Sequence, residues 1–351
     1  MSSPRVLVEV RRGAIVEARH RGSIIALEPS GRVVASLGDH DAITSTRSAI
    51  KPIQAIPVIT SGAADRFNFS EREIALTCAS HNGEPIHTEG VEALLARVGL
   101  SEKAARCGAH RPYCEETARK LERAGVPFSQ LHNNCSGKHA GMLATAVHLG
   151  LELEDYVSAD HPIQIAITSL LRRLGDIQGD LAVAVDGCSA PTFGISPRSL
   201  ALMLARLVNC ALKSPASSNP LNESEQTAAR RIISAMIAHP ELVGGTSGRV
   251  DTDLIRAAAG KLISKIGAES LYAIGVLPCE RFPNGLGIAI KIEDGAKRGL
   301  NPTVIETLLQ LGAIGAAERE QLTSYHRERL ISVRGREVGE VVPVFDLGIA
   351  K

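Results

Sequence analysis

The sequence predicts an α+β fold in which one antiparallel sheet, built from the two ends of the chain, is flanked by helices. Strand-like segments stand near both ends: residues 6–10 alternate between apolar and polar side chains, as half-buried strands do, and residues 286–292 read as a strand after a turn. The middle of the chain has mostly helical spacing, and only residues 181–185 look like a strand there. A parallel sheet would need strands spaced through this middle part, so an antiparallel sheet with an inserted helical subdomain is favoured.

The N-terminal part contains the first strands of this sheet. Residues 6–10 alternate, and residues 15–22 and 23–28 read as two further β segments. Pro29-Ser30-Gly31 is a turn signal, so residues 32–37 are expected to return as the second arm of a hairpin.

The helices follow from apolar spacing and from one clear start signal. Ser70 is followed three residues later by Glu73, which predicts a capping box at the start of a helix. Further helices are expected over residues 89–98, 115–124, 140–149, 164–174, 200–211, 223–238, 254–258 and 301–311. Strands are expected over residues 270–277, 286–292 and 342–345.

Two portions result from this order of elements. Residues 1–60 and 255–351 are predicted to form the sheet-containing α/β portion, and residues 61–254 the mostly helical portion. This is the plan of the serine β-lactamase and DD-peptidase fold, in which helices cover an antiparallel sheet.

Composition excludes several classes of protein. The 351 residues are 44% hydrophobic and 22% charged, as in ordinary globular proteins, with a net charge of +1 and no tryptophan. No basic stripe interleaves with aromatic residues, so nucleic acid is not an expected partner. No apolar run is long enough to span a membrane, and charges near the N-terminus exclude a signal peptide. Seven scattered cysteines indicate reduced thiols, and we expect a cytoplasmic protein.

The first candidate for chemistry is a serine and a lysine three residues apart. Ser48 and Lys51 stand where strand-like alternation gives way to helical spacing, and residues i and i+3 share one face of a helix. A desolvated lysine can accept a serine proton, and Ser-x-x-Lys at a helix start is the nucleophile arrangement of penicillin-recognising enzymes. The alternative is a helix-capping serine beside a solvated lysine.

Two further motifs follow in the order that those enzymes use. Ser80-His81-Asn82 has the form Ser-x-Asn, and Lys265-Ile266-Gly267 has the form Lys-x-Gly. The order of the three motifs is a stronger signal than any one of them. The alternatives are that Ser80 lies in a turn after a helix and that Lys265 is a solvated lysine at a strand edge.

A second cluster contains two cysteines. Cys135 is close in sequence to Lys138 and His139, and Cys188 lies on a separate predicted turn. Thiols with a nearby nitrogen ligand suit a soft metal, although the spacing matches no zinc finger. The alternative is that both cysteines are buried thiols that pack as small hydrophobic side chains.

Five stretches together resemble the Rhizobium etli type L-asparaginases, and the resemblance runs over nearly the whole chain. They are Arg47–Gln54 (RSAIKPIQ), Cys78–Glu84 (CASHNGE), His132–His139 (HNNCSGKH), Asp186-Gly187-Cys188, and Lys265–Glu269 (KIGAE). The run around His132–His139 is the most specific of them. Family membership would make the chain an amidohydrolase that converts L-asparagine to L-aspartate and ammonia.

The resemblance implies a homodimer with a β-lactamase/glutaminase-like fold, no membrane partner and a zinc ion in each chain that modulates substrate affinity. It implies a set of site residues: catalytic Ser48 with Lys51 and Ser80 with Lys265, zinc ligands Cys135, Lys138 and Cys188, and substrate-binding Arg47, Asn134, His139 and Asp186. Lys261 is the alternative to Lys265 as the second lysine. A glutaminase, a β-lactam-recognising hydrolase and a non-catalytic zinc or thiol-sensing protein are the alternatives for function.

Overall fold

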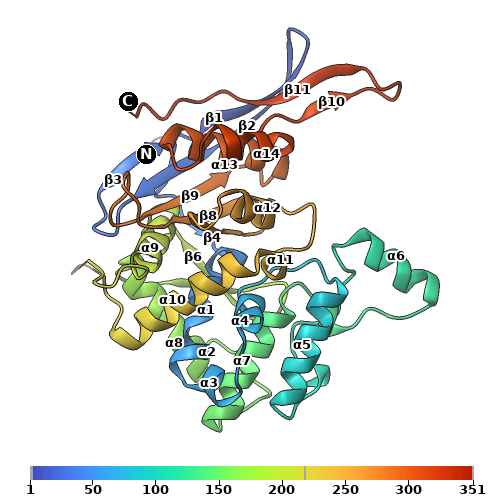
Figure 1. Ribbon diagram of the computed structural model, residues 1–351, viewed down its shortest axis with the longest axis vertical. Helices are drawn as coiled ribbons and strands as arrows, with labels where there is room; N and C mark the ends of the chain where they lie inside the picture. The colour runs from blue at the N-terminus through green and yellow to red at the C-terminus, as the bar shows by residue number, and fades with distance from the viewer. Residues whose placement is uncertain (1–2, 217–218, 350–351) are drawn as a thin grey trace. The chain divides into compact units, whose positions relative to one another are not determined.

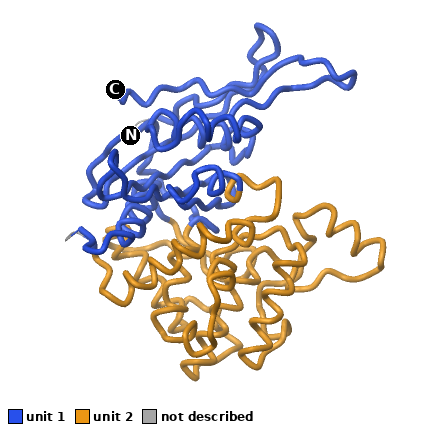
Figure 2. The backbone as a smooth tube through the Cα atoms, in the orientation of Figure 1, with its two compact units in different colours: residues 1–49, 195–219, 253–351 blue, residues 50–194, 220–252 orange. Residues whose placement is uncertain are grey.

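The computed structural model describes residues 3–216 and 219–349, and the chain forms two compact units (Figure 2). Unit 1 comprises Met1–Ala49, Ile195–Asn219 and Asp253–Lys351. Unit 2 comprises Ile50–Gly194 and Pro220–Thr252. The sheet portion therefore takes in a middle segment, Ile195–Asn219, in addition to the two ends of the chain.

Most strands come from the two ends of the chain, and most helices come from its middle (Figure 1). The strands are β1 (Arg5–Arg12), β2 (Ile15–Leu27), β3 (Val33–Leu37), β4 (Thr44–Ser45), β5 (Ala182–Val185), β6 (Pro191–Ile195), β7 (Leu262–Ile266), β8 (Leu271–Val276), β9 (Leu286–Ile292), β10 (Arg329–Ile331) and β11 (Glu337–Pro343). The α-helices are α1 (Lys51–Gln54), α2 (Ile56–Thr60), α3 (Ala63–Arg66), α4 (Glu71–Thr77), α5 (Pro85–Arg97), α6 (Glu115–Ala124), α7 (Ser136–Leu149), α8 (Pro162–Gly175), α9 (Pro197–Asn209), α10 (Glu223–Ala238), α11 (Pro240–Val243), α12 (Val250–Ala257), α13 (Lys297–Leu311), α14 (Ala316–Gln321) and α15 (Thr323–His326). Three 3₁₀ helices complete the set: η1 (Arg47–Ile50), η2 (Glu102–Ala104) and η3 (Gln130–His132).

Unit 1 is built on an antiparallel sheet with the strand order β10-β11-β1-β2-β9-β8-β7, and β3 also pairs with β2. The central strands pair in continuous register: Ile24 lies opposite Ile290, and Tyr272 lies opposite Ile290 on the other side of β9. Strands from both ends of the chain thus form one sheet, which confirms the fold class predicted from the sequence.

Every residue from Gly22 to Leu27 in β2 is buried. Successive residues of a strand point to opposite faces, so both faces of the sheet are covered at this place. α9 contacts β2, β8 and β9, whereas α13 contacts β1, β9 and β11 (Figure 1). The approach of α9 is close: a Cβ atom on Gly287 would lie 1.8 Å from the carbonyl oxygen of Ala201, and one on Gly275 would lie 2.3 Å from Val208 Cγ1. Glycine at both positions is therefore required for this helix to pack.

Unit 2 is mostly helical and is organised around α7, which contacts α2, α3, α4, α5 and α8. Every residue of α7 from Ser136 to Ala146 is buried. The helix can lie against the end of α4 because Gly137 has no side chain, and a Cβ atom there would lie 2.2 Å from Leu76 O. β5 and β6 form a hairpin in which Ala182 pairs with Gly194.

Several elements differ in extent from the prediction. The two β segments predicted over residues 15–28 form the single strand β2, because Gly22 and Ser23 continue the ladders instead of breaking them. α7 begins at Ser136, four residues before the predicted start. β4, β6, β7 and β10 were not predicted, since each has at most five residues and lacks a clear alternating pattern.

Two global expectations bear on the class of protein. Within residues 3–216 and 219–349, no helix combines the length and the apolar character that a membrane crossing requires. All seven cysteines lie in these ranges, and none is joined to another by a disulfide.

Candidate active site

The candidate site in unit 2 begins with a buried segment, residues 79–84, that follows α4. α4 starts at the predicted capping box: Ser70 Oγ accepts from Glu73 N at 3.4 Å, and Glu73 Oε2 accepts from Ser70 N at 2.8 Å. Past the helix, Ser80 N donates to Val243 O at 2.9 Å and His81 N to Asn134 O at 3.1 Å. These backbone hydrogen bonds fix the position of Ser80, and only 4% of its surface is exposed.

Lys51 meets this segment from the first position of α1. Its side chain is only 1% exposed, and Nζ donates to Ser80 Oγ at 2.9 Å, to Cys135 Sγ at 3.1 Å and to Ala79 O. These three contacts hold the Lys51 nitrogen between Ser80 and Cys135. The structure thus brings together the lysine of the first motif and the serine of the second.

Ser48 lies in η1, immediately before α1, and is partly exposed. Lys51 is the first residue of α1, so the two residues of the predicted Ser48–Lys51 pair belong to successive helices. Arg47, the first residue of η1, has a left-handed backbone with φ 43°. Such a conformation costs free energy in a residue with a side chain and is common at functional sites.

Cys135, Lys138 and Cys188 form one buried group, which we call the thiol cluster. Cys135 is the N-cap residue of α7 and Lys138 lies one turn further on, because that helix begins earlier than predicted. Lys138 Nζ donates to Cys188 Sγ at 3.2 Å, and the two thiols are hydrogen-bonded to each other. The contact between Lys51 and Cys135 Sγ joins this cluster to Ser80.

Charge in the thiol cluster is strongly polarised. The hydrogen bond from Cys188, with the charges of Lys51 and Lys138, holds the pKa of Cys135 well below its usual range in spite of burial. The bond to Cys135 and burial raise the pKa of Cys188. Burial opposes the charge on Lys138, but the two sulfurs outweigh it and raise the pKa of that lysine. The two cysteines therefore differ in acidity, and Cys135 is the more acidic of the pair.

The same cluster offers the donor atoms that zinc prefers, two sulfurs and a nitrogen. Across the described ranges, no three His, Cys, Asp or Glu side chains gather as a group that could hold a metal. A metal at the thiol cluster would thus need Lys138 as its third protein ligand, and that nitrogen would first have to lose a proton. With that condition, the residues fit the zinc site that the sequence predicts.

His139 and Tyr156 form a buried pair beside the cluster. Arg106 N donates to the Tyr156 hydroxyl at 2.9 Å, so this hydroxyl can donate in turn to His139 Nδ1 at 2.6 Å. His139 Nε2 is buried and has no hydrogen-bond partner among the described residues. Burial, and then the charges of Lys138 and Lys51, hold the pKa of His139 well below its usual value. This histidine is therefore neutral at pH 7.

Asn134 and Asp186 lie at the partly exposed margin of unit 2. Asn134 N donates to His110 Nε2 at 2.9 Å, and the Asn134 side-chain oxygen accepts from Cys135 Sγ at 3.4 Å. Asp186 follows β5 directly, and its backbone is fixed by a bond from its N–H to Ala190 O at 2.9 Å. Both residues thus flank the cysteines of the thiol cluster.

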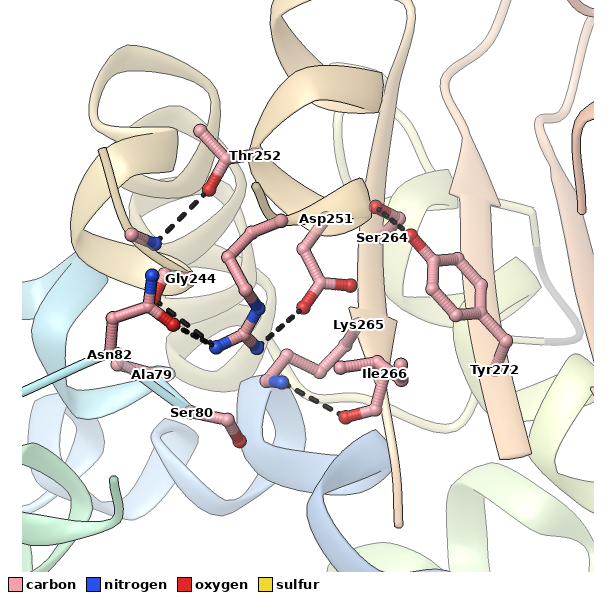
Figure 3. Close-up of polar contacts among 12 residues, drawn as sticks. Ala79, Ser80, Asn82, Gly244, Asp251, Thr252, Ser264, Lys265, Ile266 and Tyr272 are labelled. Carbon is pink, nitrogen blue, oxygen red and sulfur yellow. Dashed lines mark hydrogen bonds and ion pairs between the residues drawn. The ribbon is translucent and has the colours of Figure 1, made fainter. Parts of the chain in front are cut away.

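The two candidates for the second lysine lie in unit 1 and differ sharply in environment. Lys265 is in β7, fully buried, and its Nζ donates to Ile266 O at 3.0 Å (Figure 3). The side chain of Lys261 is 54% exposed and forms an ion pair with Glu318. Of the two lysines, only Lys265 is therefore removed from solvent.

The sequence matches the protein family described as L-asparaginase II over residues 8–343. The chain belongs to the L-asparaginase II family. It is accordingly a hydrolase that acts on amides, and its substrate is a small molecule. A comparison with curated proteins gives no match.

Solved structures similar to this member of the L-asparaginase II family include glutaminases and a carbapenemase. A probable glutaminase from Bacillus subtilis, complexed with 6-diazo-5-oxo-L-norleucine, is 16% identical with a TM-score of 0.40, covering 83% of this chain and 84% of that chain. A Bacillus glutaminase in 4.3 M NaCl is 16% identical with a TM-score of 0.36, covering 82% and 89%. A carbapenemase from Vibrio cholerae is 15% identical with a TM-score of 0.36, covering 77% and 85%. These values are too low to carry function over.

Sequence reasoning missed three residues that surround Ser80 in this L-asparaginase II chain. Asn82 was noted only as part of the Ser-x-Asn motif, and neither Glu84 nor Arg249 was singled out. Arg249 donates to Asn82 Oδ1 at 2.8 Å across 167 positions of sequence. No local sequence pattern predicts a contact between residues so far apart in the chain.

Proposed function

We propose that this protein hydrolyses the side-chain amide of L-asparagine to L-aspartate and ammonia through a serine acyl-enzyme, as the Rhizobium etli type L-asparaginases do. The observation that carries the proposal is the buried contact of 2.9 Å between Lys51 Nζ and Ser80 Oγ. A lysine and a serine hydroxyl at this distance can exchange a proton. The family supports amide hydrolysis, and the motif resemblance supports asparagine as the amide.

In the proposed reaction Ser48 attacks the amide carbon, and Lys51 in its neutral form takes the hydroxyl proton. An ester C–O bond forms, and the C–N bond breaks only when the leaving nitrogen receives a proton. The contact between Lys51 and Ser80 gives that proton a route from the lysine to the leaving ammonia. Lys265 is the proposed partner of Ser80 in this relay. Water then cleaves the ester and restores the serine.

Substrate recognition is assigned to residues around the thiol cluster and η1. Arg47 suits the α-carboxylate, because a guanidinium can bind a carboxylate with two parallel hydrogen bonds. Asp186 suits the α-amino group, and Asn134 and His139 are proposed to line the pocket. Asparagine and glutamine differ by one methylene, which a binding pocket distinguishes by only about 1–3 kcal/mol. Relative rates on these two amides are therefore the quantity to measure.

Cys135, Lys138 and Cys188 are the proposed ligands of one zinc ion per chain. When bound, zinc would supply a fixed positive charge and hold the two sulfurs and the lysine nitrogen together. The protein's own residues have structural roles here: Lys138 anchors the first turn of α7, and Cys135 holds Lys51 beside Ser80. We propose that the cluster tunes substrate affinity and takes no part in generating the nucleophile. A homodimer in the cytoplasm, expected from the sequence, stays part of the proposal.

Ammonia release by the purified protein tests the function directly. Release from L-asparagine at a higher kcat/KM than from L-glutamine supports the proposal, and the reverse order would make the enzyme a glutaminase. Ser48→Ala and Lys51→Ala should each abolish turnover, and the double variant should be no worse, because residues acting as a unit are non-additive. No ammonia from either amide would favour a zinc or thiol-sensing role.

A second substrate separates the roles of the two serines. The β-(4-nitrophenyl) ester of aspartate releases nitrophenolate, which needs no proton to leave. Ser80→Ala should therefore lose amide hydrolysis and keep ester hydrolysis, whereas Ser48→Ala should lose both. Ester hydrolysis that survives in Ser48→Ala and disappears in Ser80→Ala would make Ser80 the nucleophile.

A further inference from the structure

Asn82, two residues beyond Ser80, belongs to a group of polar side chains in unit 2 that also contains Glu84, Arg249 and Asp251. We call it the Asn82 cluster. Arg249 donates to Asn82 Oδ1 at 2.8 Å and contacts Asp251 Oδ2 at 3.4 Å (Figure 3). Asn82 Nδ2 donates to Glu84 Oε1 at 3.1 Å and to Ser247 O at 3.4 Å. Asp251 is fully buried and the Arg249 side chain is 17% exposed.

These contacts occupy both N–H donors of the Asn82 amide and one acceptor position of its oxygen. Its NH₂ group has two donors, and both are directed to protein acceptors, Glu84 and the Ser247 carbonyl. Its oxygen accepts from Arg249. Asn82 therefore has no amide hydrogen left for a substrate. Its side chain instead fixes the backbone segment that carries Ser80.

The backbone around Gly245 completes the arrangement. Thr246 N donates to both carboxylate oxygens of Glu84 at 3.2 Å, and Thr252 Oγ1 accepts from Gly245 N at 3.3 Å. A Cβ atom on Gly245 would lie 2.1 Å from Asn82 Nδ2. The space beside Asn82 is thus filled to the point where one methyl group would displace the amide.

The loop that follows α11 consequently holds the Ser80 segment at two places. Val243 O accepts from Ser80 N at 2.9 Å at the start of the loop, and Arg249 binds Asn82 near its end. Arg249 also donates to Gly244 O at 3.4 Å, which ties the two ends of the loop to each other. Any displacement of Asn82 would therefore be passed along two residues of backbone to Ser80, whose hydroxyl lies 2.9 Å from Lys51 Nζ.

We propose that Arg249 is a positioning residue: through Asn82 it fixes Ser80 at the distance from Lys51 that proton transfer to the leaving group requires. The proposal rests on the proposed function, in which Ser80 carries that proton. A displacement of about 1 Å at a reacting group can cost roughly 100-fold in rate. Amide hydrolysis should be sensitive to such a displacement, whereas hydrolysis of a nitrophenyl ester, which needs no proton on its leaving group, should not.

The test is the ratio of kcat for L-asparagine to kcat for the β-(4-nitrophenyl) ester of aspartate. Arg249→Met should lower this ratio roughly 10- to 100-fold, with KM for asparagine changed by less than about twofold. Arg249→Lys should recover part of the loss. Asn82→Ala should lower the ratio as far as Arg249→Met does, and the double variant should lower it no further, because one residue acts through the other.

Arg97→Met is the matched control. Arg97 is in the same unit and donates to a carboxylate oxygen of Glu73 at 3.0 Å and to the carbonyls of Phe67 and Asn68 at 3.3 Å. Its loss should lower thermal stability and leave the amide-to-ester ratio unchanged. An equal fall in the ratio for Arg97→Met and Arg249→Met would reduce the effect to general destabilisation and overturn the proposal.

Ser80→Ala distinguishes a failure of the positioning role of Arg249 from a failure of the proposed role of Ser80 in proton transfer. A fall in the ratio for Ser80→Ala together with a wild-type ratio for Arg249→Met would refute the positioning role and leave the proposed function standing. A wild-type ratio for Ser80→Ala would refute the role of Ser80 itself. If Arg249→Met does not fold, Arg249→Lys, which has one nitrogen in place of the guanidinium fork, must lower the ratio, and an unchanged ratio overturns the proposal.

Discussion

Acid should destabilise the fold through a stacked pair of buried histidines, His81 and His87. Their rings lie 4.7 Å apart and nearly parallel, and both side chains are fully buried. His87 Nδ1 accepts from Glu84 N at 3.1 Å and His81 Nδ1 accepts from Gly83 N at 3.1 Å. A proton added at Nδ1 would have to replace one of these bonds. Burial, followed for His81 by the charge of His87, holds the pKa of each ring below its usual value.

The sign and size of the effect follow from linkage. Each folded-state pKa lies below the unfolded value of about 6.5, so the unfolded chain binds more protons and stability falls as pH decreases below that value. Between the folded and unfolded pKa values the loss is about 1.4 kcal/mol per pH unit for each histidine, or about 2.8 kcal/mol for the pair. Above about pH 7.5 neither ring contributes a slope.

Urea unfolding measured at pH 8.0, 6.0, 5.5 and 5.0 would test this value. His87→Gln keeps a donor and an acceptor but cannot titrate, so its stability curve should be shallower than wild type below pH 6, by at most about 1.4 kcal/mol per pH unit. The measurement at pH 8 serves as the internal control, because the two curves should be parallel there. A variant as steep as wild type below pH 6 would refute the conclusion that His87 is held neutral.

Three further outcomes are expected. Gly137→Ala should destabilise unit 2 by about 1–3 kcal/mol in thermal unfolding, because its Cβ atom would meet Leu76 O at 2.2 Å, and wild-type stability would mean that α7 and α4 are not in contact there. Lys138→Met should lose the stoichiometric zinc that metal analysis of the wild type is expected to show and should raise KM more than it lowers kcat; full zinc occupancy would remove Lys138 from the ligand set. Ser70→Ala should cost about 1 kcal/mol in urea unfolding through loss of the capping box of α4, and a cost near zero would contradict the cap.

Local patterns were sufficient for the elements that depend on local physics. The apolar run after the turn at residues 283–285 predicted β9 with the bounds it has, and helical spacing did the same for α6 and α10. The capping box at Ser70 also formed as predicted, because its partners are only three residues apart. In the helices and the capping box, the interactions that define the element lie within it.

Elements that depend on distant neighbours were less predictable. α7 begins at Ser136 because Gly137 can rest against the carbonyl of Leu76, a contact that no window of sequence contains. The partner of Lys51 is a case of the same kind, since Ser80 lies 29 residues away along the chain. Spacing alone pointed to Ser48, and only the fold of unit 2 shows where the lysine nitrogen is directed.

The interrupted course of unit 1 along the chain bears on its biosynthesis. Unit 2 ends at Thr252, whereas β2 pairs with β9, which is made about 260 residues after it, so the main sheet depends on contacts of high sequence separation. A ribosome adding roughly 5–20 residues per second would expose the apolar side of β2 for tens of seconds before its partner emerges. During that time the helical unit can already be complete. Unit 1 is thus the part of the nascent chain that needs protection from aggregation, and chaperones should be found on β1 and β2 while unit 2 is being made.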